Sequence, residues 1–182
     1  MQIKTFAIPG PVLITPTRHG DGRGWFIEAF KADWFRTTVA DVGFIQDNQS
    51  FSAQTGTVRG LHCQTGASAQ GKLVRCLRGA IFDVAVDVRP GSATYGQWAA
   101  ATLTPENAEQ LWVPEGFLHG FCTLTPDTEV FYKVTAPYDP AAEFGVAFDD
   151  ADIAIDWPVK RAEAVLSDKD RVLPPLRAVA EA

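Results

Sequence analysis

The sequence predicts an all-β fold, a sandwich or jelly-roll barrel with a few short helices, on two observations. The first is the frequency of turn residues, because 15 glycines and 12 prolines interrupt the chain at short intervals. The second is that runs of β-branched and aromatic residues, each long enough for a strand, fill the gaps. Many short strands with regular turns in a chain of 182 residues are typical of one domain, 1–182.

The expected strands follow one another through the middle of the chain. Six segments bounded by turn residues each predict a strand or a strand pair: LVRCLRG (73–79), AIFDVAVDVRPG (80–91), YGQWAAATL (95–103), EQLWVPEG (109–116), HGFCTLTP (119–126) and EVFYKVTAPY (129–138). The clearest is 81–88, where large apolar residues alternate with Asp83, Ala85 and Asp87. A period of two with both carboxylates on one face predicts that this face meets water, a polar partner or a ligand.

Two short helices are expected outside these strands. One covers residues 30–38, with Phe30 and Trp34 on one face. The other begins near Ser167, whose side chain could cap the sequence SDKDR, and ends before Pro174 and Pro175.

Composition narrows the class of protein. The formal net charge is −6 and the 16 lysines and arginines are scattered, which argues against nucleic acid as a partner. A local ring of basic side chains could still bind an anionic small molecule. The N-terminus MQIKTFAIPGPV has no apolar run after a basic start, and no stretch of about 18 apolar residues occurs anywhere. We therefore expect no membrane segment and a cytoplasmic location.

Two of the three histidines raise the question of a metal. The sequence PEGFLHGF (114–121) resembles the second half-motif of cupin barrels, whose histidine often binds a metal. The first half-motif of metal-binding cupins usually supplies His-x-His, but here the stretch is His62-Cys63-Gln64. A stable site needs about three converging ligands, and this chain offers only His62, His119 and one unlocated carboxylate or thiolate. We expect no metal; a lone histidine could equally be a buried residue bonded to a backbone carbonyl.

The three cysteines are expected to have a structural rather than a catalytic or metal-binding role. Cys63, Cys76 and Cys122 are odd in number and lack CxxC spacing, which argues against a disulfide framework or a zinc site. Cys63 adjoins His62, and neighbouring side chains on a strand point to opposite faces. A Cys/His nucleophile pair is therefore disfavoured, and each cysteine is expected to be a small buried residue.

Taken together, seven motifs identify a family. RGLHCQ, QGKLVRCLRGAIFDVAVDVR, GQW, LWVPEGFLHGF, VFYK, IDWP and LSDKD occur in order over residues 8–176. This string closely resembles the dTDP-4-dehydrorhamnose 3,5-epimerases, which act in making activated L-rhamnose. The resemblance implies a cupin-type jelly-roll barrel that binds a nucleotide-sugar and needs no cofactor. It also implies inversion of carbons 3 and 5 of a 4-keto-6-deoxyhexose through an enolate.

The resemblance implies four catalytic residues. His62 matches the base, and Asp170 the carboxylate that orients it; only the resemblance selects Asp170 over Asp168. Tyr132 matches the acid on the opposite face of the sugar, and Lys72 lies near the ketone oxygen. Without the resemblance, Asp170 would be a surface or cap acid, Tyr132 a packed strand residue and Lys72 an exposed turn lysine.

The resemblance also implies a wider binding site and a homodimer. The positions associated with substrate binding are Arg23, Glu28, Gln46, Asn48, Arg59, His119, Glu143 and Lys169. Strand parity suggests that Asp83 or Asp87 orients His119. Family members are typically homodimers with exchanged N-terminal strands, and RGWFIEAF (23–30) would be such a segment, although core packing explains its aromatic residues nearly as well.

One departure from the family pattern and three alternative functions stay open. The family commonly has an aromatic residue where this chain has Cys63, so a void or repacking behind the strand is expected. The chain could instead invert only one carbon, could be a non-catalytic nucleotide-sugar-binding barrel, or could be a metal-dependent cupin oxygenase, which Gln64 opposes. The joint presence of His62, Tyr132, Lys72 and Asp170 favours the full epimerase.

Overall fold

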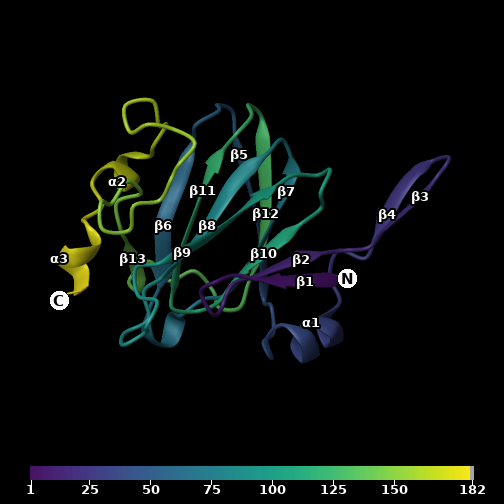
Figure 1. Ribbon diagram of the computed structural model, residues 1–182, viewed down its shortest axis with the longest axis horizontal. Helices are drawn as coiled ribbons and strands as arrows, with labels where there is room; N and C mark the ends of the chain where they lie inside the picture. The colour runs from purple at the N-terminus through teal and green to yellow at the C-terminus, as the bar shows by residue number, and fades with distance from the viewer. Residues whose placement is uncertain (181–182) are drawn as a thin grey trace.

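Two antiparallel sheets form the body of the protein in a computed structural model that describes residues 1–180 (Figure 1). The larger has the order β1 (Gln2–Thr5), β2 (Val12–Thr15), β10 (Gln110–Val113), β7 (Lys72–Arg78), β12 (Thr128–Val134) and β5 (Gln46–Ser52). The smaller has the order β13 (Glu143–Gly145), β6 (Val58–Gln64), β11 (Phe117–Thr123), β8 (Ile81–Asp87) and β9 (Trp98–Leu103). No helix within residues 1–180 is long and apolar enough to cross a membrane.

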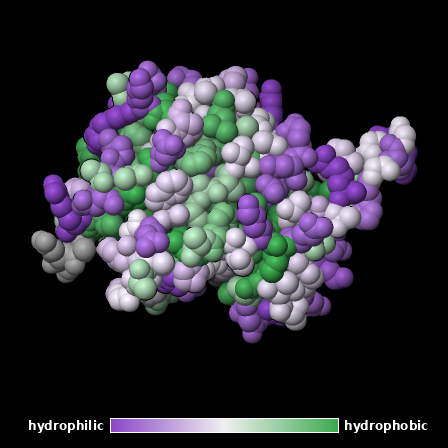
Figure 2. Space-filling view, viewed as in Figure 1, coloured by the Kyte–Doolittle hydropathy of each residue, from purple (hydrophilic) through white to green (hydrophobic). Residues whose placement is uncertain are grey.

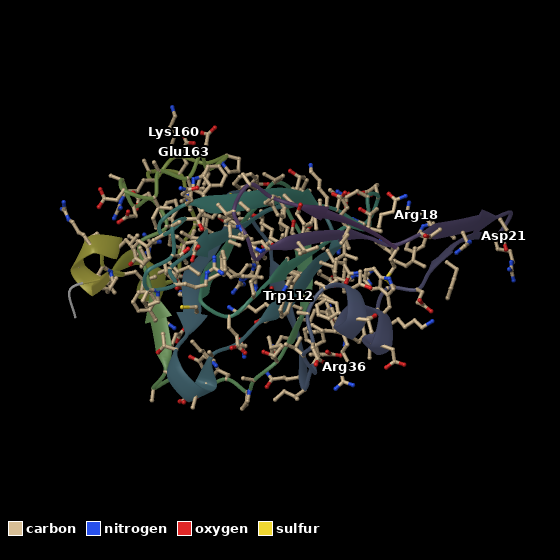
Figure 3. The ribbon with its side chains drawn as sticks, turned by 60° about the horizontal axis from the view of Figure 1, so that its bottom comes forward. Arg18, Asp21, Arg36, Trp112, Lys160 and Glu163 are labelled. Carbon is tan, nitrogen blue, oxygen red and sulfur yellow. The ribbon has the colours of Figure 1, made fainter. Side chains whose placement is uncertain are left out.

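The core lies between the two sheets, and further layers cover their outer faces. Apolar residues of both sheets, among them Val74, Leu111 and Phe121, form the central cluster. Helix α1 (Ala32–Thr38) packs Phe35 against Trp112 on the outside of the larger sheet (Figure 3). The C-terminal segment, with α2 (Asp168–Arg171) and α3 (Leu176–Ala180), covers the smaller sheet. The two sheets stay separate, so the expected jelly roll is cupin-like without being a closed barrel.

Most expected elements are confirmed. Each of the six predicted segments overlaps one strand, β7 to β12, and α1 lies within 30–38. Ser167 caps α2, because its Oγ accepts a hydrogen bond from the Asp170 backbone N–H at 3.1 Å. The face of β8 that carries Asp83 and Asp87 does not meet water. Both carboxylates are fully buried and bind polar partners instead.

A hairpin of β3 (Arg18–Asp21) and β4 (Gly24–Ile27) stands clear of this body (Figure 2). Asp21 marks its far end (Figure 3). Trp25 and Phe26 on this hairpin are 54% and 67% exposed. Large apolar side chains held away from the core indicate a surface that another molecule covers.

A bulge in β6 sets the direction of its side chains. His119 of β11 lies opposite His62, but Phe121 lies opposite Arg59, so three steps along β6 match two along β11. A regular strand would send Arg59 and His62 to opposite faces, and the extra residue brings both to one cavity. The chain passes through the bulge at Gly60 with φ of +123°.

Replacing Gly60 with alanine should destabilise the fold. An added Cβ would lie 2.6 Å from the Gly120 Cα and 2.7 Å from the His119 carbonyl oxygen. We expect urea denaturation to show a loss of about 3 kcal/mol or more in unfolding free energy. Gly43→Ala is the matched control, because a Cβ there meets nothing within 4 Å, and it should shift stability by less than about 1 kcal/mol. Equally small losses at both positions would contradict this packing.

Candidate active site

Strands from both sheets line a cavity between them. It consists of two hollows, of about 430 and 340 Å³, which share His62, Lys72 and Tyr132. Ten of the twelve residues expected at the site line it: these three, with Arg59, His119, Lys169 and Asp170 in the first hollow and Gln46, Asn48 and Glu143 in the second. Residues distant in the sequence are thus brought to one place.

His62 pairs with Asp170 across the gap between β6 and α2. The His62 Nε2 lies 2.6 Å from the Asp170 Oδ1. Burial alone would raise the pKa of Asp170. The hydrogen bond and charge of His62, with smaller effects of Ser167 and Lys169, together outweigh burial and hold the pKa below its usual value. An ionised Asp170 keeps the proton on Nε2 and leaves the Nδ1 lone pair to accept another proton. This is the arrangement of an oriented general base.

A second histidine–carboxylate pair lies beside the first. His119 is the direct cross-strand neighbour of His62, and its Nε2 lies 2.8 Å from the Asp83 Oδ1. Asp83 therefore orients His119, as strand parity suggested, whereas Asp87 binds Arg89, Ser92 and Thr94. The other oxygen of Asp83 is buried without a partner among the described residues.

Lys72 is half-buried at the start of β7 rather than exposed in a turn. Its Nζ lies 3.5 Å from the His62 carbonyl oxygen. Burial lowers the pKa of Lys72, while nearby Cys63, Asp83 and Glu143 act in the opposite direction. The Lys72 side-chain amine therefore lies inside the cavity, close to His62.

Tyr132 faces His62 from the other sheet. It lies on β12 of the larger sheet, paired with Asn48, whereas His62 lies on the smaller sheet. Burial raises the pKa of Tyr132, partly offset by the charge of Arg59, so the hydroxyl keeps its proton at neutral pH. A base and a proton donor therefore stand on facing walls of one cavity.

A charged cluster, the charged rim, contains residues of both hollows: Tyr138 and Glu143 line the second, and Lys169 lines the first. Glu143 pairs with Lys169 and also accepts a hydrogen bond from the Tyr138 hydroxyl at 2.9 Å. Burial raises the pKa of Glu143, but the hydrogen bonds from Lys169 and Tyr138 bring it below its usual value. The rim thus carries fixed charges of both signs.

Arg23 and Glu28 are not at the cavity. Arg23 lies at the turn of the β3–β4 hairpin with its side chain 91% exposed, and it pairs with Asp21 at 2.6 Å. Glu28 directly follows β4 and is also exposed. The structure of the single chain therefore does not bring Arg23 and Glu28 together with the other ten residues.

Sequence reasoning missed Ser50 and Tyr138, and considered Gln64 only as a departure from a metal motif. Ser50 could have been found, because Gln46, Asn48, Ser50 and Ser52 alternate along β5 with exposed residues. The Ser50 Oγ is buried without a partner among the described residues, and it lines the first hollow. Tyr138 lies in a loop that has no periodicity to reveal it.

Cys63 lies on the opposite face of β6 from His62, as expected. It packs with Leu61, Val84 and Leu118 against the C-terminal segment. A separate cavity of about 520 Å³ adjoins it, bordered by Val88 and Phe144. Within residues 1–180 no three histidine, cysteine, aspartate or glutamate residues cluster as metal ligands would.

Comparison with known proteins points to one family. A family model described as dTDP-4-dehydrorhamnose 3,5-epimerase matches residues 5–178. The dTDP-4-dehydrorhamnose 3,5-epimerase of Sinorhizobium fredii is 57% identical over 176 residues, which make up 97% of this chain and 90% of that protein.

Solved structures of epimerases have the same fold. The dTDP-6-deoxy-D-glucose-3,5-epimerase of Legionella pneumophila, in complex with dTDP-4-keto-L-rhamnose, has a TM-score of 0.93 at 42% identity, covering 99% of this chain and 95% of that one. A 3'-monoepimerase from Streptomyces bikiniensis, in complex with dTDP-quinovose, has a TM-score of 0.88 at 33% identity, covering 97% of this chain and 88% of that one.

The three thiols should be unreactive in the folded protein. Burial raises the pKa of Cys63, Cys76 and Cys122 to about 11, so almost no thiolate exists at about pH 8. We expect a disulfide reagent to titrate no thiol in the native protein and all three cysteines after denaturation. Rapid reaction of any thiol in the native state would contradict its burial, and rapid reaction of Cys63 itself would restore it as a candidate nucleophile.

Proposed function

Because the chain belongs to the dTDP-4-dehydrorhamnose 3,5-epimerase family, we propose that it inverts carbons 3 and 5 of dTDP-4-dehydro-6-deoxy-D-glucose to give dTDP-4-dehydro-L-rhamnose. The observation that carries this proposal is that two side chains suited to proton transfer lie on opposite walls of the cavity. The Asp170-oriented His62 stands on one wall of the cavity, and the protonated Tyr132 on the facing wall.

The chemistry of the substrate accounts for these groups. Carbons 3 and 5 each flank the ketone, so loss of either proton gives a carbanion that is delocalised as an enolate. His62 removes the proton from one face, and Tyr132 returns a proton to the other, which inverts the centre. Lys72 stabilises the enolate oxygen as its charge develops. Neither step calls for a metal or a redox cofactor.

The remaining cavity residues suit a nucleotide-sugar. Arg59 and Lys169, which both line the first hollow, supply positive charge for phosphate oxygens. Gln46 and Asn48 supply neutral hydrogen-bonding groups, and Gln46 Nε2 donates to Asn48 Oδ1 at 2.8 Å. In this proposal a single domain, 1–182, binds the small-molecule substrate. The protein acts in the cytoplasm.

The functional unit in this proposal is a homodimer. The exposed Trp25 and Phe26 are available for contact with a second copy, and Arg23 lies at the end of the same hairpin. The hairpin of one protomer would reach over the cavity of its partner and deliver Arg23 and Glu28 to the bound nucleotide-sugar.

A single-site epimerase is the second candidate, favoured by the likeness to the 3'-monoepimerase. Incubation with dTDP-4-keto-6-deoxy-D-glucose in deuterated water, followed by NMR, separates the two. Deuterium at both carbons 3 and 5 supports the double epimerase, and deuterium at one carbon supports the single-site enzyme. Exchange no faster than the uncatalysed background would exclude both. A chelator should leave the rate unchanged.

Loss of the orienting carboxylate should slow this exchange severely. Asp170→Asn leaves the side-chain shape but favours the wrong tautomer of His62, so we expect the exchange rate to fall by about 10³-fold or more. Asp168→Asn is the matched control in the same short helix, because the Asp168 side chain is fully exposed, and its rate should match the wild type. Similar rates for the two variants would refute the assignment of Asp170.

Mixed dimers should reveal the exchanged hairpin. Arg23→Glu and His62→Asn should each be nearly inactive as homodimers, because every cavity lacks one required group. Coexpression should restore activity to about a quarter of wild type, since about half of the dimers are mixed and each mixed dimer contains one intact site. No gain over the separate variants would contradict sharing of the site between protomers.

A further inference from the structure

Gln64, the last residue of β6, is 5% exposed and lies two residues after His62. Its side-chain amide makes three hydrogen bonds to backbone groups. Nε2 donates to the Ser68 carbonyl oxygen at 2.7 Å and to the Pro137 carbonyl oxygen at 3.0 Å, while Oε1 accepts from the Asp139 N–H at 2.8 Å. Both amide hydrogens are therefore committed to carbonyl oxygens.

The bonds of Gln64 fasten the loop that follows β12. Pro137 and Asp139 immediately flank Tyr138, so the amide holds the backbone on both sides of that residue. A second buried glutamine, Gln70, donates to the Ala136 carbonyl oxygen at 2.5 Å. The segment 136–139 is thereby attached along its length to the stretch that joins β6 to β7.

This segment forms a wall of the cavity. Tyr138 lines the second hollow together with His62, Lys72 and Glu143. Its hydroxyl bonds to Glu143, which in turn pairs with Lys169, the neighbour of Asp170. The position of Tyr138 therefore affects the charged rim. Gln64 borders the same hollow, but both of its amide hydrogens are already bonded to backbone carbonyl oxygens.

We propose that Gln64 is a positioning residue that sets the affinity for the substrate by holding segment 136–139 as the wall of the second hollow. A glutamine suits this role because two carbonyl oxygens need donors and one N–H needs an acceptor, and only a carboxamide supplies all three from one side chain. Without these three hydrogen bonds the segment would lose its attachment to the end of β6. The proton transfer between His62 and Tyr132 stays untouched.

Gln64→Met tests this role, because methionine nearly preserves the volume and removes all three hydrogen bonds. We expect KM to rise about tenfold and kcat to stay within about twofold, the pattern of lost binding without lost chemistry. Hydrogen exchange of the Tyr138 and Asp139 amides should accelerate. Gln70→Met, which removes one bond, should raise KM less. Gln97→Met is the matched control, because Gln97 is exposed, and it should change neither constant.

A double-mutant cycle with Tyr138→Ala separates positioning from general damage. If Gln64 acts through the wall, Gln64→Met added to Tyr138→Ala should raise KM by no more than about twofold. Independent effects that multiply, a fall in kcat at unchanged KM, or unchanged amide exchange would each overturn the role.

Because this role rests on the proposed function, the wild-type protein is assayed first for deuterium incorporation into the substrate. Absence of that incorporation would refute the epimerase, while amide exchange in Gln64→Met would still show whether Gln64 holds the segment. If Gln64→Met does not fold, Gln64→Glu, which keeps an acceptor for the Asp139 N–H and removes both donors, decides the question through the same cycle with Tyr138→Ala.

Discussion

The proposed site depends on the close approach of β6 and β11 at Gly60, where one extra residue enters β6. Without that bulge, strand alternation would put Arg59 on the face opposite His62. The same pairing sets His119 directly across from His62, so that both imidazoles enter one cavity. The backbones can approach this closely only because glycines occur on both strands, at Gly60 and Gly120.

The two facing sheets determine which reaction the cavity can carry out. Inversion of a carbon requires a base and an acid on opposite faces of the substrate, held at a constant separation. In the proposed reaction, His62 and Tyr132 would satisfy this need, because each stands on a hydrogen-bonded strand of a different sheet. Burial also favours a protonated Tyr132, since it raises the pKa of the phenol. The scaffold that positions the donor thus also keeps it in its donating form.

Local pattern predicted strands β7 to β12 and missed several others, among them the polar β1 and β5. β1 is exposed at every residue and β5 alternates between partly buried and exposed polar residues, so neither shows an apolar period. The site was harder to predict, because His62 and Asp170 are separated by 108 positions and no spacing rule joins them. Only resemblance selected Asp170, whereas strand parity narrowed the partner of His119 to Asp83 or Asp87, and the structure identifies Asp83. Loop residues such as Tyr138 gave no signal.

Adjacent residues of β6 serve different parts of the molecule. His62 faces the cavity, Cys63 packs into the apolar layer under the C-terminal segment, and Gln64 binds the loop that carries Tyr138. A change at Cys63 therefore acts first on packing behind the strand, where a cavity already exists. A change at Gln64 acts instead on the cavity wall. The side chain of Gln64 forms hydrogen bonds to backbone groups. A histidine at this position could bind a metal, whereas the glutamine holds the loop in place.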